Sequence, residues 1–297
     1  MDFWHRLGRI IRKSNLGTLI FFVLNIAMLF LLLFPEGVTK EEALILVGCY
    51  AISIIISISP LGEWAMTFAV GGREIKRNDI KLKIIPLLDV VYEKAKEKTP
   101  GLVKSIRLKI INDDTPNAFA IGRKTICVTS GLLKLSDDDI MGVLAHEMGH
   151  IAYRHSVIQL LIGGGNVFIS GCLLIIKITC WAISGLLTII SFGAKNYLAG
   201  VISVALGAFS TFLIWLWTKF CMLFLMWSMR QNEYIADEYA FRIGFGNELA
   251  SVLDREICDV PKIGLLKALY STHPSNDDRI AKLQELGATY SQYLSIQ

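Results

Sequence analysis

The residues best placed to do chemistry lie at positions 146–150, which read His-Glu-Met-Gly-His. Two histidines four positions apart share one face of a helix, so both imidazoles can bind one metal ion while Glu147 acts beside them as a general base. The chain has five histidines in 297 residues, and three of the five lie between His146 and His155. The spacing therefore predicts a zinc site that activates water, with His146 and His150 as ligands and Glu147 as the catalytic group.

A second pair of polar residues, Glu233 and Asp237, follows the last long apolar stretch. A catalytic zinc keeps three protein ligands and one open position, so the two histidines need a partner, and we expect Glu233 to supply it. Asp237 lies one helical turn further on, where its carboxylate can accept the free N–H of a ligand histidine and fix the tautomer. The two motifs together predict one Zn²⁺ per chain.

The helix that carries the first motif is expected to begin near Asp137. Ser136 can form a capping box with Asp139, and acidic residues favour the positive end of a helix dipole. Apolar residues follow at helical period, and we expect the helix to continue to His155. On such a helix His155 projects roughly 140° away from His150, so we interpret it as a membrane-interface residue or as a support for the ligands, and not as a ligand.

The segment before the motif predicts one helix and a small antiparallel sheet. Residues 84–98 have the apolar spacing of an amphipathic helix, and residues 105–111 alternate as a strand does. Residues 117–121 and 125–129, joined by Gly-Arg-Lys, read as a hairpin. An edge strand here could hold an extended peptide over the metal by adding a strand to the sheet. A hairpin that serves only packing fits the pattern equally well.

Composition places the chain in a membrane, because 53% of its residues are hydrophobic and only 19% are charged. The apolar runs at 16–34 and 43–59 each have about the length of one span, and the stretch at 157–229 is too long for a single span. Since Glu233 must return to the side of the first motif, that stretch crosses the membrane an even number of times. We expect two crossings, with the turn at 193–196.

Four consecutive regions follow from this reading: a transmembrane hairpin at 1–60, the first half of the catalytic domain at 61–156, a second transmembrane hairpin at 157–229, and the second half of the domain at 230–297. Basic residues flank the first hairpin, and its turn is acidic on balance, so the positive-inside rule puts the N-terminus and the catalytic domain in the cytosol. The predicted fold class is an α-helical membrane protein with about four transmembrane helices and an α+β zincin-like cytosolic domain.

The charged residues and cysteines narrow the set of partners. The net charge of +4 is modest, and the basic residues are scattered beside the apolar runs, which excludes a nucleic-acid partner and indicates contact with the lipid bilayer. The six cysteines form no CxxC pair. We expect them to be reduced thiols, which agrees with a cytosolic catalytic domain.

The chain resembles the integral-membrane zinc metallopeptidases of the HtpX type, which are related to the type I CAAX prenyl proteases. The resemblance covers nearly the whole sequence. One departure is the segment 177–196, which is unusually apolar for a connecting loop. The matching stretches are Asn117-Ala118-Phe119-Ala120, the motif at 146–150, Glu233-Tyr234-Ile235-Ala236-Asp237, and Thr272-His273-Pro274-Ser275 followed by Arg279.

The resemblance implies roles for residues that spacing alone does not assign. It implies that His273 or Arg279 lies near the metal and assists the reaction. From the residues alone, His273 could stabilise an oxyanion, cover the metal in a resting state, or cap the following helix. The resemblance further implies a bacterial inner-membrane enzyme of protein quality control and the stress response, whose protein substrates include misfolded or damaged membrane proteins. The residues that would align substrate are Asn117, Ala118, Phe119 and Ala120.

We therefore expect peptide-bond hydrolysis, in which Glu147 takes a proton from a zinc-bound water that attacks the carbonyl. Two alternatives stay open. A site-2-type intramembrane protease carries the same motif within an apolar span and uses an aspartate as third ligand, whereas charged residues flank this motif. A non-catalytic scaffold with structural zinc would show four protein ligands, often cysteines, and no cysteine lies near either motif. The sequence leaves the cleavage preference and the oligomeric state open.

Overall fold

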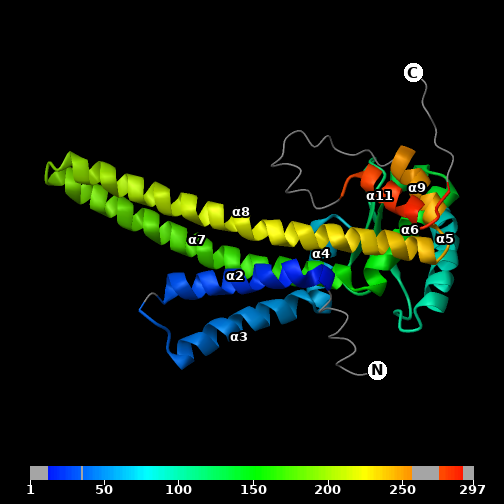
Figure 1. Cartoon of the computed structure of the whole chain (residues 1–297), viewed down its shortest axis with the longest axis horizontal. Coiled ribbons are helices and arrows are strands. Elements are labelled where there is room, and N and C mark those ends of the chain that lie inside the picture. The colour runs from blue at the N-terminus through cyan, green and yellow to red at the C-terminus, as the bar shows by residue number, and fades with distance from the viewer. Residues whose placement is uncertain (1–12, 35, 256–273, 290–297) are drawn as a thin grey trace, which may run out of the picture. The chain divides into compact units, whose positions relative to one another are not determined.

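The computed structural model describes residues 13–34, 36–255 and 274–289 (Figure 1). His273 therefore lies outside the described residues. The chain forms two compact units. One, the motif unit, is built from residues 1–16, 55–162 and 226–297. The other, the apolar unit, is built from residues 17–54 and 163–225.

Long helices make up the apolar unit. The helices that contribute to it are α2 (Leu16–Leu33), α3 (Lys40–Ser57), α7 (His155–Gly193) and α8 (Tyr197–Arg242). Inside the unit Leu29 and Tyr50 pack with Ile169 and Leu173, while most other large apolar side chains face outward. Among the described residues, three helices are long and apolar enough to cross a membrane, or up to four if α3 and the following helix α4 (Pro60–Ala69) are one span bent by 67°. This agrees with the predicted number of spans.

Helices α7 and α8 are much longer than a single span requires. They contain 39 and 46 residues, which corresponds to about 58 and 69 Å at 1.5 Å per residue, against a hydrocarbon core of about 30 Å. The turn between them lies where the sequence predicts it, since α7 ends at Gly193 and α8 begins at Tyr197. Because α8 is longer than one span, its last turns, from Met226 onward, are part of the motif unit.

A four-stranded sheet lies in the motif unit, in the order β1-β2-β4-β3. Its strands are β1 (Arg73–Glu74), β2 (Arg107–Ile111), β3 (Ala118–Ile121) and β4 (Thr125–Thr129). β3 and β4 form the predicted antiparallel hairpin, but β4 pairs with β2 in parallel. The prediction of a purely antiparallel sheet is therefore wrong. The sheet is mixed because β4 inserts between β2 and β3, and β3 is left at the edge.

The two faces of the sheet have different surroundings. Leu108, Ile126 and Val128 point into the main core, where they pack with helices α5 (Asn78–Lys98) and α6 (Asp137–Ala152). Arg107 pairs with Thr125 on the opposite face, because side chains alternate along a strand.

The helix predicted at 84–98 is present as α5, but it begins earlier, at Asn78. The short 3₁₀ turns η1 (Lys13–Asn15) and η2 (Leu132–Lys134) complete the helical elements before α6.

Helix α6 begins at Asp137, as its capping signal predicts. The Ser136 side chain accepts a hydrogen bond from the backbone N–H of Asp139 at 3.2 Å. The helix ends at Ala152, because Arg154 takes a positive φ of 63° and interrupts the backbone before α7 starts. The prediction that the motif helix continues to His155 is therefore wrong.

Three shorter helices of the described residues also belong to the motif unit: α4 (Pro60–Ala69), α9 (Gly246–Arg255) and α11 (Asn276–Glu285). Leu249 and Leu253 of α9 and Leu283 of α11 are buried in the same core as α6. Burying such side chains contributes about 1.5–3 kcal/mol each. α9 packs directly on α6, and α11 packs on α9.

Candidate metal centre

The site is built where α6 and the last turns of α8 approach each other closely. A Cβ atom on Gly149 would lie 2.9 Å from the Cα of Ala236, closer than real side chains allow. Glycine at this position therefore sets the spacing of the two helices. His146 and His150 come from the same stretch of α6 as Gly149, and Glu233 lies one turn before Ala236 on α8.

Three buried donor groups meet at this contact. The Nε2 atoms of His146 and His150 are 3.1 Å apart. The carboxylate of Glu233 lies 3.5 Å from the first and 3.3 Å from the second. Among the described residues these three side chains form the one group suited to holding a metal ion, with ligand atoms within 4.8 Å of one another. The structure thus brings together the three predicted ligands.

The other nitrogen of His146 faces a buried ion pair. Its Nδ1 lies 2.8 Å from Oδ1 of Asp237, as the spacing of Glu233 and Asp237 predicts. Asp237 also accepts two hydrogen bonds from Arg279, from Nε at 2.8 Å and from Nη2 at 2.7 Å. Arg279 comes from α11, and its Nη1 lies 4.0 Å from Glu233. Nη2 of Arg279 also lies 3.3 Å from Nδ1 of His146, so Arg279 contacts both Asp237 and one of the metal donors.

The other nitrogen of His150 faces a third histidine. Its Nδ1 lies 3.2 Å from Nδ1 of His155, which is buried and whose ring stacks on Tyr153 with centroids 5.7 Å apart. The break at Arg154 brings His155 back toward the motif helix. Of the two roles that the sequence leaves open for His155, the geometry favours support of a ligand.

These contacts show that the donor set fits a cation. A carboxylate only accepts hydrogen bonds, so Nδ1 of His146 carries the proton and Nε2 presents a lone pair. When His150 likewise donates from Nδ1 to His155, its Nε2 also presents a lone pair. Two lone pairs 3.1 Å apart beside a carboxylate repel one another unless a positive charge lies among them. Two imidazoles and one carboxylate are a donor set typical of catalytic zinc.

The shifted pKa values of two side chains also indicate that the site favours a positive charge. Burial alone would lower the pKa of His146, but the carboxylates of Asp237 and Glu233 outweigh this effect and raise the pKa to about 10. Burial would also lower the pKa of Arg279, yet the Asp237 carboxylate raises it above its usual value. The carboxylates thus favour a positive charge on their neighbours, which suits a metal cation.

Glu147 lies between the donors and the edge of the sheet. Its Oε2 accepts a hydrogen bond from the backbone N–H of Ala120 at 2.7 Å. Burial raises the pKa of Glu147, against the influence of His146 and His150. A raised pKa suits a carboxylate that must accept a proton and later return it.

The four residues expected to align substrate lie on or next to the edge strand. Ala118 and Ala120 are buried on the core side, Phe119 is half-buried, and Asn117 is exposed. The backbone N–H of Asn117 donates to Thr129 Oγ1 at 2.9 Å. Because the N–H of Ala120 points to Glu147 and not to β4, backbone groups of this strand face the metal donors.

The site and the fold together are those of a membrane-bound metallopeptidase whose candidate metal donors are two histidines and one glutamate. The family description "Peptidase family M48" matches residues 87–287, which is more than half of the chain. The chain therefore belongs to peptidase family M48. This confirms the prediction of an HtpX-type integral-membrane metalloendopeptidase, and the family implies a bound metal.

Curated relatives agree with the family. The chain is 26% identical over 296 residues to a "Protease HtpX homolog" of Desulfotalea psychrophila, with 90% of this chain and 98% of the relative covered. It is 29% identical over 202 residues to one of Halobacterium salinarum, with 66% and 60% covered. Among solved structures, the crystal structure of S. mikatae Ste24p matches 87% of this chain and 61% of that chain, at 16% identity and a TM-score of 0.49.

Both alternatives from the sequence are less consistent with these findings. Helix α6 is not among the helices of the described residues that could span a membrane, whereas a site-2-type enzyme carries its motif inside a span. A non-catalytic scaffold does not agree with membership of a peptidase family. The donor group of the described residues also holds three ligands, as a catalytic site does, and not four.

Proposed function

We propose that the chain is a zinc-dependent endopeptidase that binds one Zn²⁺ through His146, His150 and Glu233. The convergence of these three donors beside Glu147 and an open strand edge is the observation that carries the proposal. When bound, the metal acidifies a water molecule and polarises the carbonyl group of a substrate. Every other part of the chemistry falls to side chains and backbone groups of the chain.

Glu147 is the proposed general base. Its position beside the ligands lets it accept the proton of the attacking water and pass it to the departing amine. Asp237 and His155 hold the two imidazoles by their second nitrogens, which keeps the rings in one tautomer and one orientation. Arg279 is a positioning residue that fixes Asp237 and neutralises its charge.

The substrate is proposed to lie along β3 as an additional strand. An edge strand offers unpaired backbone groups on one side, and an extended peptide that pairs with them has its own carbonyl groups at a fixed height above the sheet. The N–H of Ala120 points toward Glu147. A peptide carbonyl that replaces Glu147 at the N–H of Ala120 would thus bring one of the peptide's bonds next to the general base. Phe119 lies between Ala118 and Ala120, and Asn117 precedes them.

The variant Glu147→Gln tests the assignment of the general base. It should keep the metal and lose cleavage by at least roughly 100-fold, because a general base contributes about 10²–10⁴ to the rate. Cleavage of a membrane-protein substrate in proteoliposomes is measured together with metal content. Glu93→Gln, which changes an exposed glutamate of α5, is the matched control and should cleave normally. Wild-type cleavage by Glu147→Gln would show that another group is the base.

Metal analysis tests the identity of the ion. Imidazole and carboxylate donors also suit other transition metals, so the purified protein should contain about one zinc per chain and lose activity on chelation. Zinc should restore activity at lower concentration than Mn²⁺ or Co²⁺. A preparation that is active with another metal and zinc-free would contradict the zinc assignment while leaving the ligands unchanged.

The proposed substrates are misfolded or damaged membrane proteins, handled by a catalytic domain on the cytosolic side of a bacterial inner membrane. Basic residues flanking the first hairpin support this orientation. Cysteine accessibility at exposed positions such as Lys98 tests it directly. Proteins that accumulate in cells carrying Glu147→Gln, compared with wild-type cells, would identify the substrates. Accumulation of soluble proteins alone would contradict the substrate class.

A further inference from the structure

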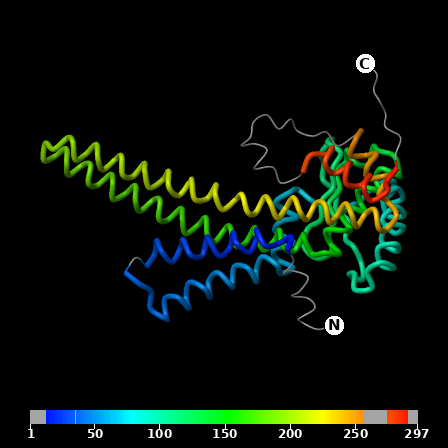
Figure 2. Tube along the Cα trace, in the orientation of Figure 1, coloured from blue at the N-terminus to red at the C-terminus, as the bar shows by residue number. Residues whose placement is uncertain are grey.

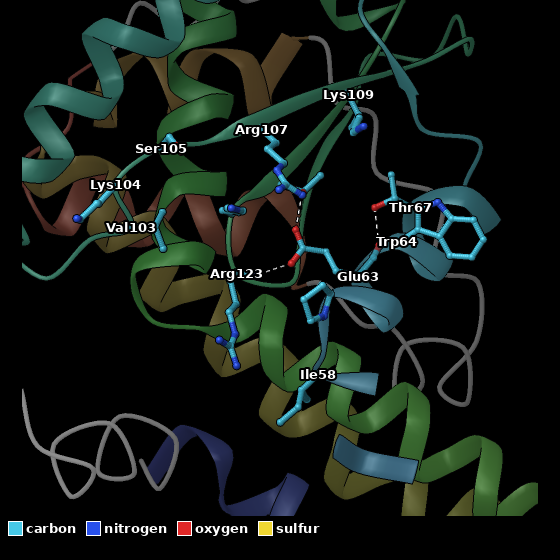
Figure 3. A pocket seen from close by; sticks show the side chains of 13 residues that line it. Ile58, Glu63, Trp64, Thr67, Val103, Lys104, Ser105, Arg107, Lys109 and Arg123 are labelled. Carbon is cyan, nitrogen blue, oxygen red and sulfur yellow. Dashed lines mark hydrogen bonds between the residues drawn. The ribbon is translucent and has the colours of Figure 1, made fainter. Parts of the chain in front are cut away.

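A cavity of about 440 Å³ lies between α4 and the sheet, on the face opposite the main core (Figure 3). We call it the α4 cavity. None of the described residues that line this cavity is one of the three metal donors. Five of the lining side chains are basic and one is acidic, namely Lys104, Arg107, Lys109, Arg123, Lys124 and Glu63. Such an excess of positive charge in one cavity attracts anions.

Among the residues that the structure describes, few carboxylates pair with these cations. The carboxylate of Glu63 accepts hydrogen bonds from the backbone N–H of Arg123 at 3.2 Å and from the hydroxyl of Thr125, so it anchors α4 to the β3–β4 turn (Figure 3). Lys109 pairs with Glu74. The salt bridges among the described residues include none from Arg107, Arg123 or Lys124. Three cations at the cavity are thus available to a ligand.

The helix that forms one wall has the character of a membrane-interface helix. Leu61, Trp64 and Phe68 lie on one side of α4, at exposures of 59%, 63% and 73%. The rings of Trp64 and Phe68 stack with centroids 5.8 Å apart. α4 also begins directly after α3, with only two residues between them. Exposed aromatic side chains next to a span are typical of helices that lie at the level of lipid headgroups.

We propose that the α4 cavity binds the phosphate headgroup of an anionic phospholipid from the surrounding membrane. Guanidinium groups donate paired hydrogen bonds to phosphate oxygens, and Arg107 and Arg123 lie on either side of Glu63 in the cavity (Figure 3). Ile58 and Pro60 line the same cavity and offer apolar contact to the glycerol backbone. The bound lipid would hold the sheet, and with it the edge strand β3, next to the bilayer.

Native mass spectrometry of the full-length protein, released from nanodiscs of phosphatidylglycerol and phosphatidylcholine mixed in equal amounts, tests this proposal. The wild type should retain phosphatidylglycerol roughly tenfold more often than phosphatidylcholine, since basic residues near a membrane attract anionic lipid. The pocket variant should lose this preference. It combines Arg107→Gln, Arg123→Gln and Lys124→Gln.

The matched control removes three positive charges from exposed positions of α5, with Lys81→Gln, Lys96→Gln and Lys98→Gln. The control should keep the lipid preference, and both variants should keep their metal content. An unchanged preference in the pocket variant, or an equal loss in the control, would overturn the proposal. So would displacement of the lipid by an equal concentration of glycerol phosphate, which would indicate a site for small anions.

Cleavage kinetics separate a lipid site from a substrate site. The lipid proposal predicts that the pocket variant, assayed in detergent without lipid, has the wild-type KM for acidic and neutral peptides alike. A KM that rises for acidic peptides only, with the lipid preference retained, would instead identify the cavity as a substrate subsite. This outcome is independent of the zinc assignment, because both variants leave the metal ligands unchanged.

Discussion

The two ligand histidines lie one turn apart on the same helix, yet the chain supports them with different chemistry. Nδ1 of His146 faces a carboxylate, Asp237, whose charge is balanced by Arg279. Nδ1 of His150 faces another imidazole, that of His155. One histidine is therefore supported by a buried ion pair and the other by a second imidazole ring.

The difference limits the buried charge that the site must carry. A carboxylate partner makes an imidazole a stronger donor to metal, but a buried carboxylate is costly unless a cation accompanies it. The chain supplies one such cation, Arg279, and it is shared between Asp237 and the neighbourhood of Glu233. A carboxylate in place of His155 would need a second cation. The imidazole of His155 can orient His150 without a second cation.

The largest effect is expected from Asp237→Ala. It leaves Arg279 buried without its main partner, and breaking a buried pair by removing one member destabilises a protein by about 3–5 kcal/mol. Metal affinity should also fall, because Arg279 is then free to turn toward Glu233. Denaturation in detergent and metal titration measure the two effects. A variant as stable as the wild type would show that the ion pair is not the main support of this side of the site.

Gly149→Ala affects both histidines at once. The added methyl group would clash with Ala236 and push α6 and α8 apart, at a cost of about 1–3 kcal/mol. Metal affinity and stability should fall together. Gly163→Ala is the control, since a Cβ there meets no atom within 4 Å, and alanine favours the helix. Equal behaviour of the two variants would contradict the role assigned to the close contact.

His155→Ala tests the contact between His150 and His155. Loss of a partner to a ligand histidine should weaken metal binding by about 10–100-fold, while stability should fall less than in Asp237→Ala because no charge is left unpaired. Competition with a chelator measures the affinity. His155→Asn keeps an acceptor oxygen and should recover part of the loss. If His155→Ala binds metal like the wild type, His150 does not depend on this contact.

The smallest effect is expected from Arg242→Met, which removes an exposed ion pair with Glu238 at the end of α8. Surface pairs of this kind contribute less than about 1 kcal/mol. Stability and metal affinity should stay close to those of the wild type. The variant thus gives the baseline for charge removal on the helix that carries Glu233. A large loss of stability or of metal affinity would mean that this exposed end of α8 helps to position the metal donors.

Local spacing predicts the parts of the site that lie within one helix. His146 and His150 share a face of α6, and Glu233 and Asp237 share a face of α8, because four residues make about one turn. The start of α6 is predictable for the same reason, since Ser136 and Asp139 are neighbours in the chain. Only local geometry is needed for these expectations.

Contacts that depend on chain breaks or distant packing are harder to predict. The 140° argument for His155 assumes an unbroken helix, and the positive φ of Arg154 removes that assumption. Arg279 lies 42 positions after Asp237 and reaches it through the packing of α11, so no spacing rule links the two residues. The resemblance to a known family supplied Arg279 as a candidate, but its contacts come from the structure.

The sheet shows the same limit. The sequence predicts strands at residues 105–111, 117–121 and 125–129, but the pattern of alternation does not say which strands are neighbours. The parallel pairing of β2 with β4 depends on tertiary packing, and so does the two-residue strand β1. Glu63 likewise gives no sequence signal, because its partners lie about 60 positions away, at Arg123 and Thr125.

The division of the ligands between α6 and α8 has a consequence for how the enzyme is made. Synthesis proceeds from the N-terminus, so His146 and His150 leave the ribosome before α7 and α8, Glu233 leaves within the last turns of α8, and Arg279 leaves after it. A chain that stalls before the end of α8 therefore lacks the third of the proposed ligands. With Glu233 in that role, the metal site cannot be completed until the last long apolar helix has been made.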